Sequence, residues 1–222
     1  MNTLEERVQR ALREDVAIVP YDAAWPELFR QEAEHLRAYL PSQLIRRIEH
    51  FGSTAVPGLA AKPIIDMLVE VTALRAARTV IAPILEAQGY DYFWRPTIGD
   101  DVPPWYAFFI KRDLSGTRTH HIHMMTHRPV FQGHWERLLF RDYLIANSDV
   151  AAEYERLKKH LASTHPNDRH AYTVGKTDYI LSVMVRAKQT PNLPTAGNAG
   201  RTPQPKIRHY RPSVPEPKCS VA

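Results

Sequence analysis

A glycine–serine pair and an acid inside an apolar run are the first candidates for chemistry in this sequence. Gly52 and Ser53 follow the strand candidate IRRIEHF (45–51), and Asp66 lies within the apolar run PIIDMLVEV (63–71). A glycine allows a sharp turn where a strand ends, and a serine that opens a helix offers its hydroxyl and nearby backbone N–H groups to a phosphate. A carboxylate on the next strand is placed to hold Mg²⁺ beside that phosphate. The alternative is a capping serine and a buried acid paired with a base.

Histidines alternate in the run RTHHIHMM, which forms the second candidate site. Alternate side chains of a strand share a face, so His121 and His123 are expected on one face and His120 on the other. Two imidazoles at this spacing can bind one metal ion or contact a phosphate. The alternative is a strand whose histidines are solvated or hydrogen-bonded in the core. His127 and His134, which follow, are expected at the surface.

Basic residues dispersed along the chain form a third group: Lys62, Arg118, Arg141 and Lys176. Each of them alone is typical of a solvated surface charge. If several converge in one cleft, they form a site for a polyanion.

Apolar periodicity predicts the elements that must position these side chains. The expected strands are 45–51, 63–71, 105–111 and 119–125. The expected helices are 4–12, 26–40, 74–89, 134–146, 149–163 and 168–187. Pro83 is expected to kink or interrupt its helix, and Asp149 and Asp168 are possible N-caps. The order of elements predicts an α+β fold, a small mixed sheet followed by a helical segment.

The proline-rich end of the chain separates from the rest. Of the 34 residues in 189–222, seven are proline, and no apolar period survives there. Such a segment buries too little apolar surface to offset its ordering entropy, which predicts a disordered tail after a single domain of residues 1–188. The tail contains five basic residues and one acid, so it carries most of the net charge of +5. A nucleic-acid partner is therefore not favoured, because a tail of this charge gives only weak, salt-sensitive association.

Two further features concern the compartment. The single cysteine, Cys219, excludes an intramolecular disulfide and a cysteine-based zinc site. The N-terminal residues are charged where a signal peptide is apolar, and no stretch has the length of a membrane span. A cytoplasmic protein without a membrane partner is expected.

Five segments of the chain resemble the successive signature segments of the GrpB-like family. They are VPYDAAWPELF (19–29), IEHFGSTAVPGLAAKPIIDMLVEV (48–71), RTHHIHMM (118–125), WERLLFRDYLIAN (135–147) and AYTVGKTDYI (171–180). That family is assigned to the nucleotidyltransferase superfamily, so the resemblance implies a small mixed sheet with flanking helices and a C-terminal helical segment. Some members of the family are fused to dephospho-CoA kinase, which hints at nucleotide or coenzyme metabolism.

The resemblance also implies a modified metal site. The superfamily has a second acid two residues after the first, but Leu68 stands there, and the next acid on that face is Glu70. One strand carboxylate is too few for two Mg²⁺ ions. The resemblance implies that His121 and His123 stand where other members of the superfamily use a third acid. Two imidazoles with one carboxylate suit Mn²⁺, Fe²⁺, Ni²⁺ or Zn²⁺ better than Mg²⁺.

The function that the resemblance implies is metal-dependent transfer of a nucleotidyl group from a nucleoside triphosphate to a hydroxyl or amine of a small-molecule acceptor. The catalytic residue implied is Asp66. The metal ligands implied are Asp66, His121 and His123. The resemblance places the nucleotide phosphates over Gly52 and Ser53. For an enzyme of this kind we expect Lys62, Arg118 and Lys176 to neutralise the phosphate charge. The alternative is a module of the same fold that binds a nucleotide or an anionic cofactor without catalysis.

Overall fold

The computed structural model describes residues 4–12, 16–97, 103–191 and 193. Most of the predicted tail, including Cys219, lies outside the described residues, so the tail and the domain boundary stay predictions. No helix within the described ranges is both long enough and apolar enough to cross a membrane.

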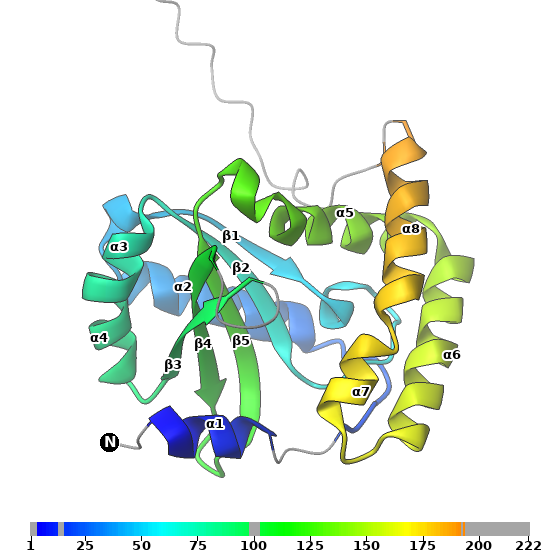
Figure 1. The fold of residues 1–222 in the computed structure, drawn as a ribbon, viewed down its shortest axis with the longest axis horizontal. Helices are drawn as coiled ribbons and strands as arrows, with labels where there is room; N and C mark the ends of the chain where they lie inside the picture. The colour runs from blue at the N-terminus through cyan, green and yellow to red at the C-terminus, as the bar shows by residue number, and fades with distance from the viewer. Residues whose placement is uncertain (1–3, 13–15, 98–102, 192, 194–222) are drawn as a thin grey trace, which may run out of the picture.

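A five-stranded mixed sheet forms the centre of the fold (Figure 1). Its strands are β1 (Ile45–Phe51), β2 (Ile65–Val71), β3 (Asp91–Pro96), β4 (Trp105–Arg112) and β5 (Arg118–Met125), in the order β1-β2-β5-β4-β3. The central pair β2 and β5 is parallel, and the other neighbours are antiparallel. All four predicted strands are present. The fifth, β3, was not predicted, because this edge strand is half-buried along most of its length and shows no clear alternation.

Helices cover both faces of this sheet and extend beyond one of its sides (Figure 1). They are α1 (Leu4–Leu12), α2 (Trp25–Tyr39), α3 (Leu74–Ala76), α4 (Ala82–Glu86), α5 (Gln132–Ala146), α6 (Ser148–Thr164), α7 (Arg169–Val174) and α8 (Thr177–Gln189). The α+β expectation is therefore confirmed.

The two faces of β2 enter different parts of the core. Ile65, Met67 and Val69 pack under α2, α3 and α4. Leu68, on the opposite face, packs with Trp135 of α5. A strand buried on both faces is apolar almost throughout, which makes the carboxylate of Asp66 conspicuous.

Two predicted helices are interrupted. Residues 77–81 form a π-helical turn between α3 and α4, just before Pro83, whose ring would clash with a carbonyl of a regular helix. The predicted helix 168–187 is two helices, α7 and α8, that part at Gly175 and Lys176.

The two predicted N-caps have different outcomes. Asp168 caps α7, because its carboxylate accepts a hydrogen bond from the backbone N–H of Ala171 at 2.9 Å. Asp149 is not a cap, since it lies inside the first turn of α6, after Asn147 and Ser148.

Candidate metal and anion site

The turn after β1 brings the backbone against a carboxylate. Gly52 has φ of +75°, a conformation that favours glycine. A Cβ atom at this position would lie 2.4 Å from Oδ2 of Asp66. Ser53 opens a single 3₁₀ turn, Ser53–Ala55, and not the expected helix. Any phosphate affinity of this turn must therefore come from side chains and single N–H groups, because a helix dipole is absent.

Strand register places Asp66 beside the two predicted histidines. The Cα atoms of Asp66 and His121 are paired across the parallel strands β2 and β5. Nδ1 of His121 lies 2.9 Å from Oδ1 of Asp66. One ligand atom each of Asp66, His121 and His123 lie within 4.8 Å of one another. The structure thus brings together the three residues that were predicted as metal ligands.

Their protonation states suit metal binding. Burial by itself raises the pKa of Asp66, but the hydrogen bond and charge of His121, with Lys62 and Arg137, outweigh it and lower the pKa below its usual range. Burial lowers the pKa of His121 and lowers that of His123 strongly. At neutral pH the group is therefore one carboxylate and two neutral imidazoles, the forms that bind metal ions.

Arg118 holds the other side of His121. Its Nη1 lies 3.0 Å from Nε2 of His121, and the residue is only 6% exposed. Since Nδ1 of His121 donates to the Asp66 carboxylate, we assign Nε2 as the acceptor of the arginine N–H. Arg118, which was predicted to contact phosphate, thus contacts His121 and fixes its orientation. With both ring nitrogens engaged, a metal ion held by His121 would have to displace the Nδ1 proton that His121 shares with Asp66.

A cavity of about 150 Å³ opens beside Asp66. Its lining contains most of the predicted nucleotide site, namely Gly52, Ser53, Lys62, Asp66, His121 and Lys176. His123 and Arg118 are not among the lining residues. Three further lining side chains were missed by sequence reasoning: Tyr154, Lys158 and Tyr172. We call this cavity the lysine pocket.

Three lysines give the pocket an excess of positive charge. The Nζ atoms of Lys62 and Lys176 lie 5.0 and 4.2 Å from the ring centroid of Tyr172, and Lys158 donates to the carbonyl of Ala60. Over the described part of the chain, none of the three forms an ion pair with a carboxylate. Burial and the neighbouring cations lower the pKa of Lys62 to about 7, that of Lys158 to about 7 and that of Lys176 to about 8. An anion would relieve this repulsion.

Two of the three missed residues share one face of α6. Tyr154 and Lys158 are four positions apart on α6, so they lie one above the other. Both are buried, and the side chain of Ser53 is hydrogen-bonded to Tyr154. A lysine on the apolar stripe of a helix was the available sign of an internal role.

Other expectations are corrected or limited. His134 is not at the surface but 2% exposed, because α5 packs its first turn onto Tyr106. Arg141 is also buried and does not line the lysine pocket, since it contacts Glu49, Asp142 and the carbonyl of His50. Such contacts tie α5 to β1.

The position of the second acid is apolar in the structure as well. Leu68 is fully buried in the core. Glu70 lies 3.7 Å from Arg47 and 3.9 Å from His127, and it does not join Asp66 in the described metal-ligating group. One carboxylate therefore serves this site.

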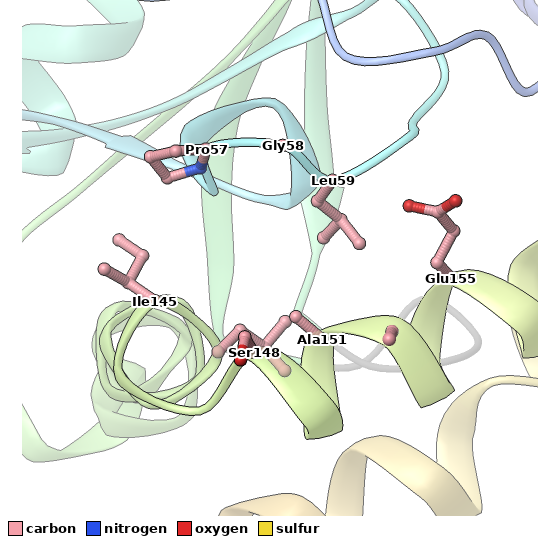
Figure 2. A pocket seen from close by; sticks show the side chains of 9 residues that line it. Pro57, Gly58, Leu59, Ile145, Ser148, Ala151 and Glu155 are labelled. Carbon is pink, nitrogen blue, oxygen red and sulfur yellow. The ribbon is translucent and has the colours of Figure 1, made fainter.

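A second cavity, of about 340 Å³, lies between the 57–59 loop and helices α5 and α6. Figure 2 shows Leu59 on the loop side and Ile145 and Ala151 on the helix side, with Glu155 at one end. Its lining holds no cation, so it does not suit a phosphate.

Known proteins resemble most of the chain. The profile of the GrpB protein family matches residues 15–186. A UPF0157 protein of Pseudomonas aeruginosa is 40% identical over 184 residues, which cover 82% of this chain and 72% of that protein. The glutamate-rich protein GrpB of Alkalihalophilus pseudofirmus is 38% identical, over 77% of this chain and 94% of that one.

A solved structure and an enzyme add to these relatives. The crystal structure of the conserved protein GrpB from Enterococcus faecalis has a TM-score of 0.67 and 33% identity, and it covers 78% of this chain and 98% of that one. A dephospho-CoA kinase of Mycolicibacterium paratuberculosis is 28% identical, with 79% of this chain matching 46% of the enzyme. The family profile and these relatives show that the chain belongs to the GrpB family.

Proposed function

We propose that this chain binds a nucleoside triphosphate with a divalent metal ion and transfers a nucleotidyl group to the hydroxyl or amine of a small acceptor. One observation carries the proposal: Asp66, His121 and His123 meet beside a pocket whose three lysines form no ion pair with any carboxylate that the structure describes. A half-buried strand acid with lysines around it suits a site for a metal ion and an anionic ligand together.

The donor set fits a transition metal. A carboxylate oxygen and two imidazole nitrogens favour Mn²⁺ or a related ion over Mg²⁺. Three protein ligands leave coordination positions for substrate oxygens. When bound, the ion would stabilise negative charge that develops on the α-phosphate.

The chain's own residues supply the rest of the nucleotide site. Lys62, Lys158 and Lys176 neutralise the phosphates, and their aromatic neighbours limit the access of water. Ser53 offers its hydroxyl at the turn. The Arg118 guanidinium keeps His121 in the orientation that faces Asp66.

In the transfer, the acceptor oxygen or nitrogen forms a bond to the α-phosphorus. The bond from that phosphorus to the bridging oxygen of the β-phosphate breaks, and pyrophosphate leaves with the electron pair. The acceptor's proton passes to water. The lysine charges stabilise the leaving pyrophosphate.

The second candidate function is a binding module without turnover. Leu68, fully buried where the superfamily has its second acid, favours this alternative. It predicts saturable nucleotide binding that depends on the lysines but gives no product.

The test uses nucleoside triphosphates labelled at the α-phosphate, Mn²⁺ and a pool of small metabolites. We expect labelled product from the wild type, none from Asp66→Asn, and wild-type yield from Asp149→Asn, which changes an exposed acid on α6. Equal transfer by Asp66→Asn would overturn the catalytic proposal. Nucleotide binding without transfer would favour the module, and no binding by calorimetry would reject both.

A further inference from the structure

A second group of cations lies on the same face of the sheet, across the strands from the lysine pocket. His123 on β5 is paired with Phe108 on β4. Tyr106, two residues from Phe108 and on the same face of β4, is paired with Arg95 on β3. Asp66 lies on β2, on the other side of β5. In Figure 1, β3 and β4 are the strands far from α6 and α7, which contribute Tyr154, Lys158 and Tyr172 to the lysine pocket.

Two arginines of this second group stack on aromatic rings. The guanidinium carbon of Arg95 lies 5.3 Å from the ring centroid of Phe108, and that of Arg137 lies 5.7 Å from the ring of Phe51. Among the described residues, neither arginine forms an ion pair with a carboxylate. Burial lowers the pKa of Arg137, and the like charge of Arg95 adds to this, while Tyr106 and Asp66 oppose it. The arginines are thus close enough to repel each other.

A buried histidine beside them lacks hydrogen-bond partners. His134 is 2% exposed, and within the described residues neither of its ring nitrogens has a partner. It precedes Arg137 by three positions on α5, so the two share a helix side. A buried polar group without a hydrogen-bond partner destabilises the folded state. This unsatisfied histidine is a second observation, independent of the arginines, that points to a ligand.

We propose that Arg95, Arg137 and His134 bind an anionic group of the acceptor, a phosphate or a carboxylate. The inference rests on the proposed function. If the nucleotide lies on the lysine side of the metal ligands, the arginine side is left for the acceptor. Guanidinium groups bind both kinds of oxyanion through paired N–H donors. The neutral imidazole of His134 adds one donor.

The lysine pocket and the arginine cluster then bind different ligands. Nucleotide phosphates lie at the lysine pocket, the acceptor's anionic group lies at the arginines, and the acceptor's hydroxyl or amine lies between them. His123 contacts both regions, since it belongs to the metal-ligating group and its ring lies 4.8 Å from Phe108. The acceptor class is therefore a small metabolite that carries a negative charge.

The test titrates the full chain in two steps. The first step adds α,β-methylene-ATP with Mn²⁺ and measures nucleotide binding by calorimetry, which tests the proposed function alone. The second step adds inorganic phosphate or acetate to the saturated protein, and the arginine Nε–H signals are followed by NMR. We expect the Arg95 and Arg137 signals to shift. The tighter of the two probes identifies the anion as phosphate or carboxylate.

Matched variants locate the second anion. Arg137→Gln and Arg95→Gln are each expected to weaken the binding of the second anion at least tenfold and to leave the nucleotide affinity within about twofold. Arg156→Gln, on an exposed position of α6, should change neither. Arg95 is exposed, so its variant keeps the test valid if Arg137→Gln fails to fold.

The outcomes separate the two proposals. Unchanged binding of the second anion in both variants, or shifts at neither arginine, would overturn the inference. Second-anion binding at Arg137 without any nucleotide binding would refute the proposed function and support the anion site.

Discussion

The close approach of Gly52 to Asp66 makes a sharp prediction about one substitution. In Gly52→Ala, the new Cβ would meet Oδ2 of Asp66 at 2.4 Å, whereas ordinary C···O contacts are about 3.3 Å or longer. The carboxylate must then move by about 1 Å, which breaks its hydrogen bond with Nδ1 of His121. Gly58→Ala is a matched control, because Gly58 has φ of +79° but a Cβ added there would meet nothing within 4 Å.

The expected costs differ by the interaction with Asp66. Both variants place a Cβ at a positive φ. This costs roughly 1–2 kcal/mol at an ordinary left-handed position, and up to about 3 kcal/mol at Gly52, whose ψ of −174° lies in a region that only glycine readily adopts. Gly52→Ala also loses a hydrogen bond to a charged group, about 1.5–3 kcal/mol, and the lower end applies because the Asp66 side chain is 28% exposed. At this chain length each kcal/mol lowers Tm by about 2–4 °C.

Two measurements check this prediction. Thermal unfolding should show a larger loss of Tm in Gly52→Ala than in Gly58→Ala. The ring ¹⁵N signals of His121 should change in Gly52→Ala alone, which gives a readout that requires no metal. Equal losses of Tm together with unchanged His121 signals in both variants would refute the reasoning.

Three further predictions concern the lysines and the buried ion pairs. The pKa values of Lys62, Lys158 and Lys176 are lowered to about 7, 7 and 8, and a bound anion should raise them. Nucleotide binding at pH 8 should therefore take up protons, and the affinity should weaken as the pH rises through this range. Calorimetry at pH 8 in buffers of different ionisation enthalpy measures this uptake, and its absence would contradict the prediction. Lys158→Met should weaken nucleotide binding by about 10–100-fold, since it removes a cation from the pocket, and should cost about 1–3 kcal/mol of stability, because the buried carbonyl of Ala60 loses its donor. The exposed Lys159→Met should do neither. Arg141→Met should lower the free energy of unfolding by about 3–5 kcal/mol, because Glu49 and Asp142 lose a buried cation. Urea unfolding measures this loss, with the exposed Arg156→Met as the control. Equal stabilities of the two variants would refute the prediction.

The sequence predicted the parts of the fold that local patterns determine. Strands β2 and β4 are largely apolar runs, β1 and β5 carry polar side chains but are bounded by turn residues, and the helix cap at Asp168 is a local hydrogen bond. The end of α7 was missed because it depends on packing: a Cβ at Gly175 would lie 2.7 Å from Cδ2 of Leu161 on another helix. No local pattern reveals that contact.

The site follows the same division. Alternation along one strand predicted that His121 and His123 share a face, but the pairing of Asp66 with His121 depends on strand order in the sheet. Lys158 joins the lysine pocket because α6 packs beside the turn at Ser53, which involves segments about 100 residues apart. Residues that act through such distant contacts are not recognisable from their neighbours in sequence.

The order of these segments along the chain has a consequence for folding during synthesis. The ligand triad is complete once residue 123 has been made, whereas Lys158 and Lys176 arrive later. During synthesis the N-terminal part of a chain emerges first, although a domain generally folds as a unit. The metal ligands are thus made before two of the three lysines, and nucleotide affinity reports that α6 and α7 have docked onto the sheet.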